Sequence, residues 1–519
     1  MKVIVELSLT PDFKEEELSK ELSLLCGCTI TSYSILRKSL DARKTPVYRY
    51  RCCVDIPHHV ATTLISIGKA TAYKEEEPVI IPKVKTNKRV PIVGCGPAGL
   101  FCALTLIEAG VAVDIYERGK TLAQRHRDVA MLREKGILDA NSNVVFGEGG
   151  AGTYSDGKLT TRIDKKEIKL FYDFMVGFGA PSSIVYEAKP HIGTDRLIGI
   201  IENIRKFLIQ KNCTIQFGKK LTDLRIHNDT LQGCYFNNTE EIVTEILVLA
   251  TGHSARDVYQ VLHARGVALQ KKGFAVGVRV EHPRELIDEI QYGKGKDGYG
   301  LHGAEYQLTF KDVTGRGVYS FCMCPGGFVI NSSSQEERLC VNGMSYSKRD
   351  GTSSNAALVV TVSQDDFKDI FDGINFQILL EEKAYQAGGG GFGAPAQRIT
   401  SFLQNSVDSS LPVCTYKPKI AASNFNTILP DFIRDPLHRA IVHFGSKMKG
   451  FITNEGILVG VETRTSSPIR IVRDENFQSI NCKGLFPVGE GAGYAGGIVS
   501  SAVDGIRAAQ KIVTLLERV

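Results

Sequence analysis

One segment, residues 90–117, constrains what this chain can fold into more than any other. It reads VPIVGCGPAGLFCALTLIEAGVAVDIYE and places Gly94, Gly96 and Gly99 in the pattern G-x-G-x-x-G. An apolar stretch precedes the glycines, a helical apolar stripe follows them, and Glu117 closes the next alternating stretch. This order of strand, glycine turn, helix and acidic residue is typical of a βαβ unit that binds the ADP part of a dinucleotide.

Each part of that turn has a physical task. Gly94 permits the tight turn, Gly96 lets the backbone approach a pyrophosphate, and Gly99 lets the helix pack on the strand. The helix N-terminus directs free N–H groups and a partial positive charge at the phosphates. The carboxylate of Glu117 is expected to accept hydrogen bonds from ribose hydroxyls and to repel a 2′-phosphate. Further contacts with the dinucleotide are expected from this segment at Pro97, Ala98 and Arg118.

The composition is that of an ordinary globular protein. Hydrophobic residues make up 43% and charged residues 23% of the 519 residues, and the net charge of +6 alone indicates no nucleic-acid partner. No apolar run approaches the roughly 20 residues that span a bilayer, and we see no signal peptide. Thirteen cysteines, without a C-x-x-C pair or metal-ligand spacing, indicate a reducing compartment. We therefore expect a cytoplasmic protein with no membrane partner and no metal.

Turns, linkers and periodicity divide the chain into four segments. Residues 1–87 alternate like a small α+β domain and end in a proline-containing linker, and residues 88–270 hold the dinucleotide unit. Residues 271–470 change to many short β-like segments and glycine loops, and residues 471–519 return to a strand, a glycine turn and a helix. We predict an α/β fold, in which a Rossmann-like domain is split in sequence by a β-rich α+β substrate domain and preceded by a small α+β domain.

Two later fragments belong with the opening turn. Residues 484–493, GLFPVGEGAG, run from an apolar strand into a glycine turn, and a second glycine pair then opens a helix near Ile498. Residues 248–252, VLATG, end a buried strand in the sequence Ala-Thr-Gly. Three separated pieces of one Rossmann-like domain imply an insertion between the second and the third, which is the usual place of a substrate domain.

These stretches resemble the uncharacterised family of bacterial-type FAD-dependent dehydrogenases with a glutathione-reductase-like FAD fold. The resemblance implies an FAD-binding domain and FAD as the cofactor, and it leaves the substrate open. It also implies that an acidic residue, here Glu490 where the family usually has Asp, binds the ribityl chain, and that the next helix N-terminus faces the flavin O2 edge. The most specific stretches are GEGGAGTYSDGKLTTR (147–162), GVRVEHP (277–283), YSFCMCPGGFVI (319–330), GMSYSKRD (343–350), GFGAPAQR (391–398) and GEGAGYAGGIVSSAVDG (489–505).

The reactive end of the flavin is expected between two glycine turns. By analogy with related flavoproteins, the turn at 147–158 lies along the isoalloxazine ring, and Lys158 or Arg162 could hold an anionic substrate or flavin. A glycine loop with a solvent-facing Lys158 is the alternative. The expected cofactor contacts outside the opening segment are Gly150, Ala151, Gly152, Gly157, Lys158, Leu221, Thr251, Gly252, Gly489, Glu490, Gly497 and Ile498.

Besides Lys158, three residues are candidates for catalysis. On a strand, Cys322 and Cys324 would point to the same face with Cα atoms about 6.6 Å apart, near the upper limit for a disulfide. They could form a redox pair or pack in the substrate pocket. Arg398 follows the glycine run 388–391 and could clamp an anion from a mobile lid, or belong to a structural loop. No proton-transfer residue is predicted, and the scattered histidines are expected to be structural.

The expected function is that of an FAD-dependent oxidoreductase. It would transfer a hydride between flavin N5 and an anionic organic substrate of unknown identity, bound between the FAD domain and the β-rich domain. An NAD(P)H-using flavin reductase or hydroxylase is an alternative. Between the FAD fragments, no second G-x-G-x-x-G stands in the strand–turn–helix setting of a stable nicotinamide domain, so NAD(P)H would bind transiently.

A third alternative rests on the basic hairpin 37–51, through which a flavin-stabilised binding protein could contact RNA. A solvated hairpin edge explains the same charges, because cations discourage strand pairing. No RNA-binding signature with stacking aromatic residues is present, so we expect no nucleic-acid partner. Against the single acid Asp41 the hairpin carries Arg37, Lys38, Arg43, Lys44, Arg49 and Arg51.

Overall fold

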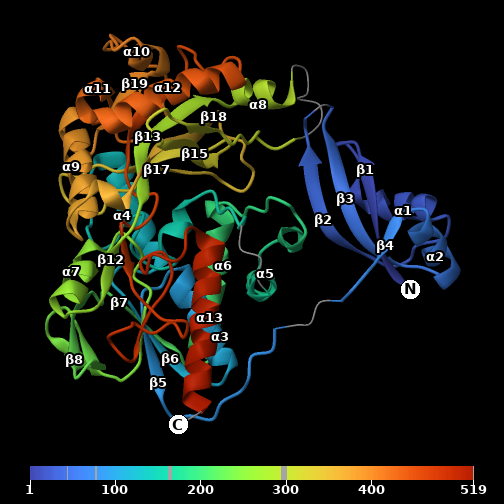
Figure 1. Cartoon of the computed structure of the whole chain (residues 1–519), viewed down its shortest axis with the longest axis horizontal. Helices are drawn as coiled ribbons and strands as arrows, with labels where there is room; N and C mark the ends of the chain where they lie inside the picture. The colour runs from blue at the N-terminus through green and yellow to red at the C-terminus, as the bar shows by residue number, and fades with distance from the viewer. Residues whose placement is uncertain (44, 76–78, 162–165, 294–300, 518–519) are drawn as a thin grey trace.

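A parallel sheet of five strands is assembled from segments far apart in the sequence (Figure 1). The computed structural model describes residues 1–43, 45–75, 79–161, 166–293 and 301–517. The strand order is β23-β11-β5-β6-β7, and every pairing is parallel. In that order the strands span Leu485–Pro487, Leu247–Leu249, Arg89–Val93, Ala112–Glu117 and Thr214–Phe217. The predicted Rossmann-like fold, split in sequence, is confirmed.

Two helices pack against each other beside this sheet. α3 (Pro97–Glu108) follows the opening glycine turn, and α13 (Ile498–Glu517) lies along it (Figure 1). The two backbones approach closely, because a Cβ atom at Gly505 would lie 2.1 Å from the carbonyl oxygen of Ala98. α3 is buried almost all round, as expected of a helix enclosed between a sheet and a second helix.

Further helices and a small antiparallel sheet complete the region between residues 88 and 270. One face of α6 is buried, since Leu197, Ile201, Ile204 and Leu208 pack in the core. The helices are α4 (Leu122–Lys135), η2 (Ala151–Tyr154), α5 (Glu167–Gly177), η3 (Ser182–Val185), α6 (Thr194–Gln210) and α7 (Arg256–Ala264). The small sheet contains β8 (Leu221–His227), β9 (Thr230–Phe236) and β10 (Glu240–Val243).

A seven-stranded sheet forms the second large unit, with the order β14-β15-β18-β13-β21-β19-β20. Its neighbours are antiparallel except for β19 and β20. The central strands β13 and β18 are buried over most of their length, which is typical of a sheet covered on both faces. The strands span Thr309–Lys311, Gly317–Cys324, Ser353–Val362, Phe274–Pro283, Ile457–Glu462, Ala394–Arg398 and Ile420–Ala422 in sheet order.

This second unit also contains long helices where the sequence suggested short β-like segments. Figure 1 shows α9 and α12 on the outer side of the sheet. The buried stripe of α9 includes Gln377 and Glu381, so polar residues interrupt the apolar periodicity that indicates a helix. Pro436 lies within α12, and a proline at such a position argues against a helix when only the sequence is known. The helices are α8 (Arg284–Tyr292), η5 (Gln364–Asp366), α9 (Asp372–Ala387), α10 (Ile399–Leu403), α11 (Phe425–Ile428) and α12 (Asp431–Lys447).

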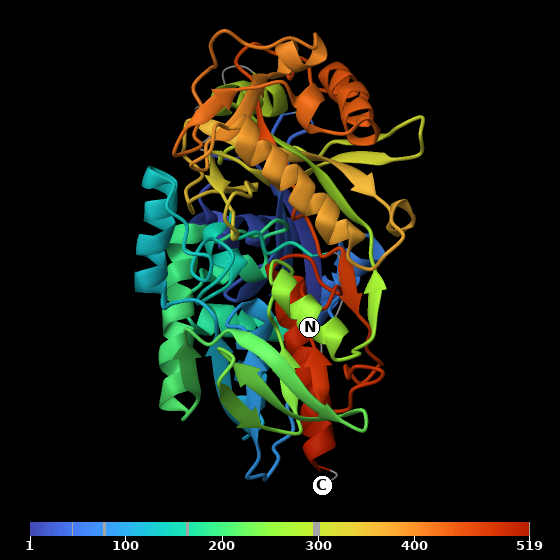
Figure 2. The same cartoon turned by 90° about the vertical axis from the view of Figure 1, so that its left-hand side faces the viewer.

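Two short strand pairs flank the two sheets. β12 (Leu269–Lys271) pairs with β22 (Ile469–Ile471), and β16 (Phe328–Asn331) pairs with β17 (Val341–Met344). Figure 2 shows the parallel sheet and the seven-stranded sheet as two stacked regions of the molecule. Among the described helices, none has the length and hydropathy needed to cross a bilayer. The exact domain boundaries stay predictions.

The N-terminal residues form a separate four-stranded antiparallel sheet with two helices on it (Figure 1). Val3 and Val5 alternate into its core, as their spacing predicts. This unit contacts the rest of the chain through β2, because the backbone N–H of Lys38 donates to Tyr186 at 2.7 Å. The elements are β1 (Lys2–Leu9), η1 (Glu15–Glu17), α1 (Leu18–Cys26), β2 (Tyr33–Asp41), β3 (Val47–Asp55), α2 (His58–Ser66) and β4 (Ala70–Ala72).

The basic hairpin is partly neutralised within this N-terminal unit. Arg43 and Arg49 both pair with Asp41, and Lys38 pairs with Glu15 at 2.7 Å. Exposed pairs of this kind contribute little to stability, but they reduce the net positive charge of the edge. Two residues named in the sequence interpretation, Lys44 and Arg162, lie outside the described residues.

Candidate functional site

Three loops meet at the C-terminal ends of β5, β11 and β23. A Cβ atom at Gly94 would lie 2.3 Å from the carbonyl oxygen of Ala250, and one at Gly491 would lie 2.8 Å from that of Gly252. Gly94 also has a φ of +108°, which side chains other than glycine rarely adopt. The three turns therefore touch backbone to backbone. They border the crevice at which open parallel sheets bind their ligands.

The N-terminus of α3 opens into this crevice without a side-chain cap. Gly96 is its N-cap residue and Pro97 its first residue. The turn that contains Gly150 lies opposite, because a Cβ atom at Gly150 would be 2.9 Å from Cα of Gly96. Gly99 allows the close packing, since a Cβ atom there would lie 2.0 Å from the carbonyl oxygen of Gly94. Free helical amides between two glycine turns form a site for phosphate groups.

Glu117 is buried and holds two turns together. One carboxylate oxygen accepts hydrogen bonds from the backbone N–H of Gly119 at 2.9 Å and of Gly147 at 3.0 Å. The other accepts from the backbone N–H of Cys95 at 2.8 Å. A carboxylate has about four acceptor positions. Backbone donors take three of these positions, and the contact of Glu117 with a ribose hydroxyl stays a prediction.

Two residues expected to contact the cofactor are engaged in protein contacts. Arg118 pairs with Asp257 at 2.8 Å and lies 4.4 Å from the centre of the Phe146 ring. Leu221 starts β8, and its side chain is buried in a hydrophobic core. Both residues help to shape the wall of the crevice. Their cofactor contacts stay predictions.

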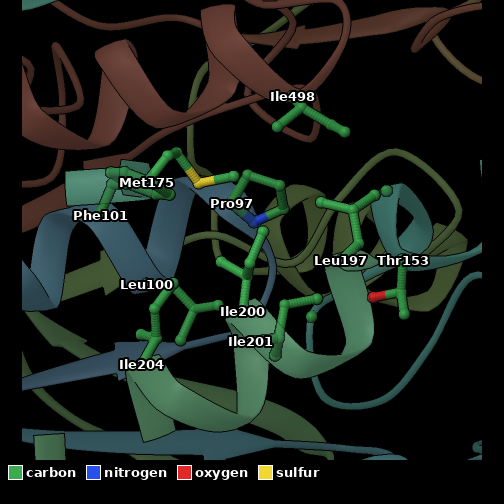
Figure 3. Close-up of a pocket in the computed structure, with 12 residues that line it drawn as sticks. Pro97, Leu100, Phe101, Thr153, Met175, Leu197, Ile200, Ile201, Ile204 and Ile498 are labelled. Carbon is green, nitrogen blue, oxygen red and sulfur yellow. The ribbon is translucent and has the colours of Figure 1, made fainter. Parts of the chain in front are cut away.

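The turns are packed against each other with almost no free space behind them. Figure 3 shows Pro97 of α3, Thr153 of η2, Ile201 of α6 and Ile498 of α13 pointing toward one apolar cavity. This cavity has a volume of about 30 Å³, the room of about one water molecule. A Cβ atom at Gly152 would lie 3.0 Å from the side chain of Ile498. Dense packing of this kind fixes the relative position of the glycine turns.

Glu490 borders open space in the late glycine turn. One of its carboxylate oxygens lies 2.9 Å from Nδ1 of His253, and the other accepts from the backbone N–H of Gly497. Desolvation acts to raise the pKa of Glu490, but the hydrogen bond and charge of His253 outweigh it and lower the pKa. Cβ atoms at Gly252 and Gly496 would meet no atom within 4 Å. The turn thus presents an ionised carboxylate beside room for a ligand, and His253 is one histidine that the structure does bring to the site.

A second carboxylate supports the late turn and was missed by the sequence interpretation. Asp504 of α13 accepts a hydrogen bond from the backbone N–H of Gly489 at 2.8 Å. It also pairs with Arg473 at 2.6 Å. Asp504 lies in the stretch 489–505 that carries the family resemblance. That stretch was the available signal, but no local pattern assigns this acid to the turn.

Lys158 lies in a cluster of five charges between the two large units. Its ammonium group is 3.1 Å from Asp156 and donates to the carbonyl oxygen of Met323 in β15. Arg349 donates to Asp156 at 2.9 Å and pairs with Glu305 at 2.8 Å. Lys189 pairs with the same Glu305 at 3.3 Å, so three cations surround two acids. Sequence reasoning found Lys158 but missed the other four members, which are up to 193 residues apart from one another in the chain.

The cluster keeps both of its central groups charged. Burial acts to raise the pKa of Asp156, but Lys158 and Arg349 hold it far below its usual range. Burial acts to lower the pKa of Lys158, and Asp156 raises it above its usual value. The Lys158 side chain retains 27% exposure. Part of this charged side chain therefore borders open space.

We expect Asp156→Asn to lower the stability of the fold at neutral pH. We also expect the stability of the variant to change less than that of the wild type as the pH falls. A carboxyl whose pKa is lower in the folded than in the unfolded protein stabilises the fold above its unfolded pKa of about 4. That contribution disappears as the pH falls. The wild type should lose thermal stability progressively below about pH 5, whereas the variant should start about 1–3 kcal/mol lower at pH 7 and change less.

Calorimetric melting at pH 7, 5, 4 and 3 measures this difference. Asp350→Asn, at an exposed acid next to Arg349, serves as the control and should follow the wild type. Parallel pH curves for the wild type and Asp156→Asn would contradict the role of the cluster.

The two cysteines of β15 do not share a face, which corrects the sequence expectation. The pairing of β15 with β18 shifts register between Phe321 and Cys324, and Cys322 has a φ of +43°. A bulge adds one residue and turns the side chains relative to the regular alternation. Cys322 is exposed, whereas Cys324 is buried with Sγ 3.9 Å from Nη1 of Arg279. All thirteen cysteines are free thiols.

Cys322 lies close to Lys158, because Lys158 donates to the carbonyl oxygen of the next residue, Met323, and both side chains are partly exposed. We call the open space beside these two side chains the recess. The side chain of Cys322 is exposed, yet desolvation raises the pKa of its thiol to about 12, against the opposing charges of Arg279 and Lys158. Because a neutral thiol is a poor nucleophile, the packing alternative suits Cys322 better than the redox alternative.

Arg398 lies away from this recess. It pairs with Asp408 at 3.3 Å and donates to the backbone carbonyl of Asn454. The strand register places four strand spacings, roughly 19 Å, between Arg398 and Cys324. The structure therefore does not bring Arg398 together with Lys158. Instead of clamping a ligand at this recess, it supports a surface loop.

The crevice and the recess fit FAD. The free amides of α3 suit the pyrophosphate, Glu117 suits a ribose, and Glu490 beside open space suits the ribityl chain. Lys158 offers a positive charge where the flavin ring is expected. Among the described residues no group of three or more potential ligands could hold a metal ion.

Family comparisons point to the same cofactor. Residues 273–465 match a family model described as "FAD-dependent protein, C-terminal domain-like", and residues 1–56 match a domain of unknown function, DUF8436. A Clostridium beijerinckii protein named "Uncharacterized protein" is 40% identical over 98% of this chain and 97% of its own length.

More distant relatives share parts of the chain. Glutamate synthase [NADH] of Saccharomyces cerevisiae is 23% identical over 54% of this chain, but the match spans 13% of that protein. The glutamate synthase [NADPH] small chain of Bacillus subtilis is 28% identical over 27% of this chain and 31% of its own length.

Solved structures of flavoproteins are similar at a low level. The flavin-dependent brominase Bmp2 has 13% identity and a TM-score of 0.35, covering 83% of this chain and 80% of its own. The E. coli quinol fumarate reductase FrdA has 13% identity and a TM-score of 0.33, covering 83% and 70%. At these scores the likeness adds nothing to what the strand order shows.

Proposed function

We propose that this chain, which belongs to the family of FAD-dependent proteins described by that C-terminal domain, is an oxidoreductase that transfers a hydride between FAD and an anionic organic substrate. The observation that carries the proposal is the recess between the two sheets, where Lys158 is charged and 27% exposed. Bound FAD supplies a hydride acceptor or donor at flavin N5. Its identity as the cofactor follows from the family.

The residues of the chain would divide the work of binding and orientation. The opening turn and the amides of α3 hold the phosphate groups, and Glu490 with Gly497 sets the position of the late turn. The N-terminus of α13 places a partial positive charge beside that turn. Lys158, fixed by Asp156 and by the bulge of β15, would orient the anionic group of the substrate. Cys322 would line the recess as a neutral thiol.

The first test is whether the purified protein is yellow and releases FAD on denaturation. Anaerobic mixing with a panel of small organic acids should then bleach the flavin with one class of substrate. Lys158→Gln should raise KM for that acid by about 10- to 100-fold, because a charge-assisted contact is lost, and Lys158→Arg should restore part of it. Lys348→Gln, at an exposed lysine, is the matched control. A colourless protein that cannot take up FAD would end this proposal.

A second candidate is a flavin reductase or hydroxylase that uses NAD(P)H. The two glutamate synthases are named for NADH and for NADPH. This favours a nicotinamide as the reductant. Anaerobic mixing with NADPH separates the candidates, since rapid bleaching without an organic acid supports the second. In either case the thirteen free thiols suit a reducing, cytoplasmic environment.

A further inference from the structure

A second and larger cavity lies apart from the flavin recess. It has a volume of about 360 Å³ and is enclosed by α4, the start of α6, the turn around Tyr154 and the β16–β17 pair. A cavity of roughly 150 Å³ can hold a benzene ring. This space is therefore large enough for a ring with a short side chain, and it falls within the usual range of ligand cavities.

The inner part of the cavity is apolar and partly aromatic. The rings of Phe328 and Tyr346 meet edge to face with centres 5.6 Å apart. The ring of His126 stacks near Tyr154, with centres 6.4 Å apart. Aromatic walls of this kind favour a flat or ring-containing body over a flexible polar one. A small hydrophobic cluster contributes its members to this lining, namely Val129, Val144, Tyr154, Phe328, Ile330 and Met344.

The mouth of the cavity carries two cations that pair with no acid among the described residues. Arg133 and Lys417 line it and are exposed, and Glu134 is the exposed acid beside them. Within the described part of the chain neither cation forms an ion pair. The other acid of the lining, Asp195, is already engaged, because its carboxylate accepts hydrogen bonds from the backbone and side chain of Ser347. The two acids equal the cations in number, but neither acid pairs with Arg133, which lies 6.0 Å from the centre of the Phe328 ring, or with Lys417. Both cations are therefore available to an anion at the mouth.

A wall of protein separates this cavity from the recess. Met344 and Tyr346 line the cavity, whereas Ser345 between them donates to Asp156 of the charge cluster. On the other side of the wall, Tyr154 at the end of η2 lines the cavity, and Asp156 follows two residues later in the loop. The same short segments therefore present one set of side chains to the cavity and another to Lys158.

We propose that this cavity binds a small carboxylic acid with an aromatic or other apolar body, at a site separate from the flavin recess. The apolar walls take the ring, and Arg133 with Lys417 takes the carboxylate. Most of the affinity comes from burial of the ring, because exposed charges interact weakly in water. The charges select the acid over its neutral analogues. The site does not depend on the reaction proposed for the flavin, and its ligand is detected by binding alone.

The test uses the FAD-loaded protein and isothermal titration with 3-phenylpropanoate and its neutral match 3-phenylpropan-1-ol. The acid should bind about tenfold more tightly than the alcohol, as expected for a charge-assisted contact. Arg133→Gln combined with Lys417→Gln should bring the two ligands to within about threefold of each other without weakening the alcohol. Arg127→Gln lies on the same helix outside the lining, and it should retain the preference. Equal binding of acid and alcohol by the wild type would overturn the proposal.

Blocking the cavity provides the second arm. Ala130 lies in the lining on α4, so Ala130→Phe should fill the space and abolish binding of both ligands while FAD stays bound. Ala123→Phe, on an exposed position of α4 outside the lining, should bind both ligands as the wild type does. Undiminished binding in Ala130→Phe would overturn the proposal. So would loss of acid binding in Lys158→Gln but not in the Arg133 and Lys417 variant, because the acid would then occupy the recess.

Discussion

Replacing Glu381 with glutamine should lower the free energy of unfolding by about 3–5 kcal/mol, one of the largest losses open to a single substitution in this chain. Glu381 on α9 is fully buried and pairs with Arg256 of α7 at 2.8 Å and with Arg464 at 2.9 Å. Burial acts to raise the pKa of Glu381, but the two guanidinium groups lower it far below its usual range. The neutral amide would leave two buried cations next to each other without an anion.

This triad also connects the two large units, so its loss should change how the protein unfolds. Arg256 belongs to the region of the parallel sheet, and Glu381 to the unit of the seven-stranded sheet. We expect urea unfolding of Glu381→Gln, followed by fluorescence and by circular dichroism, to give transitions that no longer coincide. Glu382→Gln is the matched control, since Glu382 is 42% exposed and pairs with Arg338 at 3.2 Å. Its loss should stay below about 1 kcal/mol. Similar losses in both variants would contradict the importance of the triad.

Changing Gly94 to alanine should abolish FAD binding and greatly reduce the yield of folded protein. The added Cβ atom would lie 2.3 Å from the carbonyl oxygen of Ala250, and the φ of +108° is strained for alanine. Neither β5 nor β11 can move away, because the two strands pair with each other. The turn must therefore open, and the crevice loses its shape. The measurement is the ratio of flavin absorption to protein absorption after purification.

Gly199→Ala is the control for this substitution. Gly199 lies inside α6, and a Cβ atom there would meet nothing within 4 Å. Alanine at this position should stabilise the helix by about 0.5–1 kcal/mol and leave the flavin content unchanged. A Gly94→Ala protein with full flavin content would show that the opening turn has more freedom than its contacts allow.

The opening turn could be predicted from the sequence because its signals are local. Gly94 to Glu117 form one continuous unit, in which strand, turn, helix and strand each have their own periodicity. The late strand, glycine turn and helix start at 485–498 could be predicted for the same reason. Charged clusters were not, because Asp156, Arg349 and Glu305 come from three distant segments that only the folded sheets bring together.

Local irregularities explain the remaining differences. Alternation places Cys322 and Cys324 on one face of a strand, but the bulge at Cys322 depends on pairing with β18 and on the cations that bond its backbone. The distance of Arg398 from the recess depends on the strand order, which has no signature in a single strand. The helix α9 was not predicted, because the buried Glu381 interrupts its apolar stripe. Glu381 is also the residue that pairs with both arginines of the triad.

The strand order has a consequence for synthesis of the protein on the ribosome. β11 ends at Leu249 and its neighbour β23 starts at Leu485, so 485 − 249 = 236 positions separate them. At about 5–20 residues per second, translation of that interval takes roughly 12–47 s. During this time β11 has an unpaired edge that is prone to aggregate, and Glu490 has not yet been made. FAD therefore meets the complete set of glycine turns only late in translation, and the edge of β11 stays open to aggregation until then.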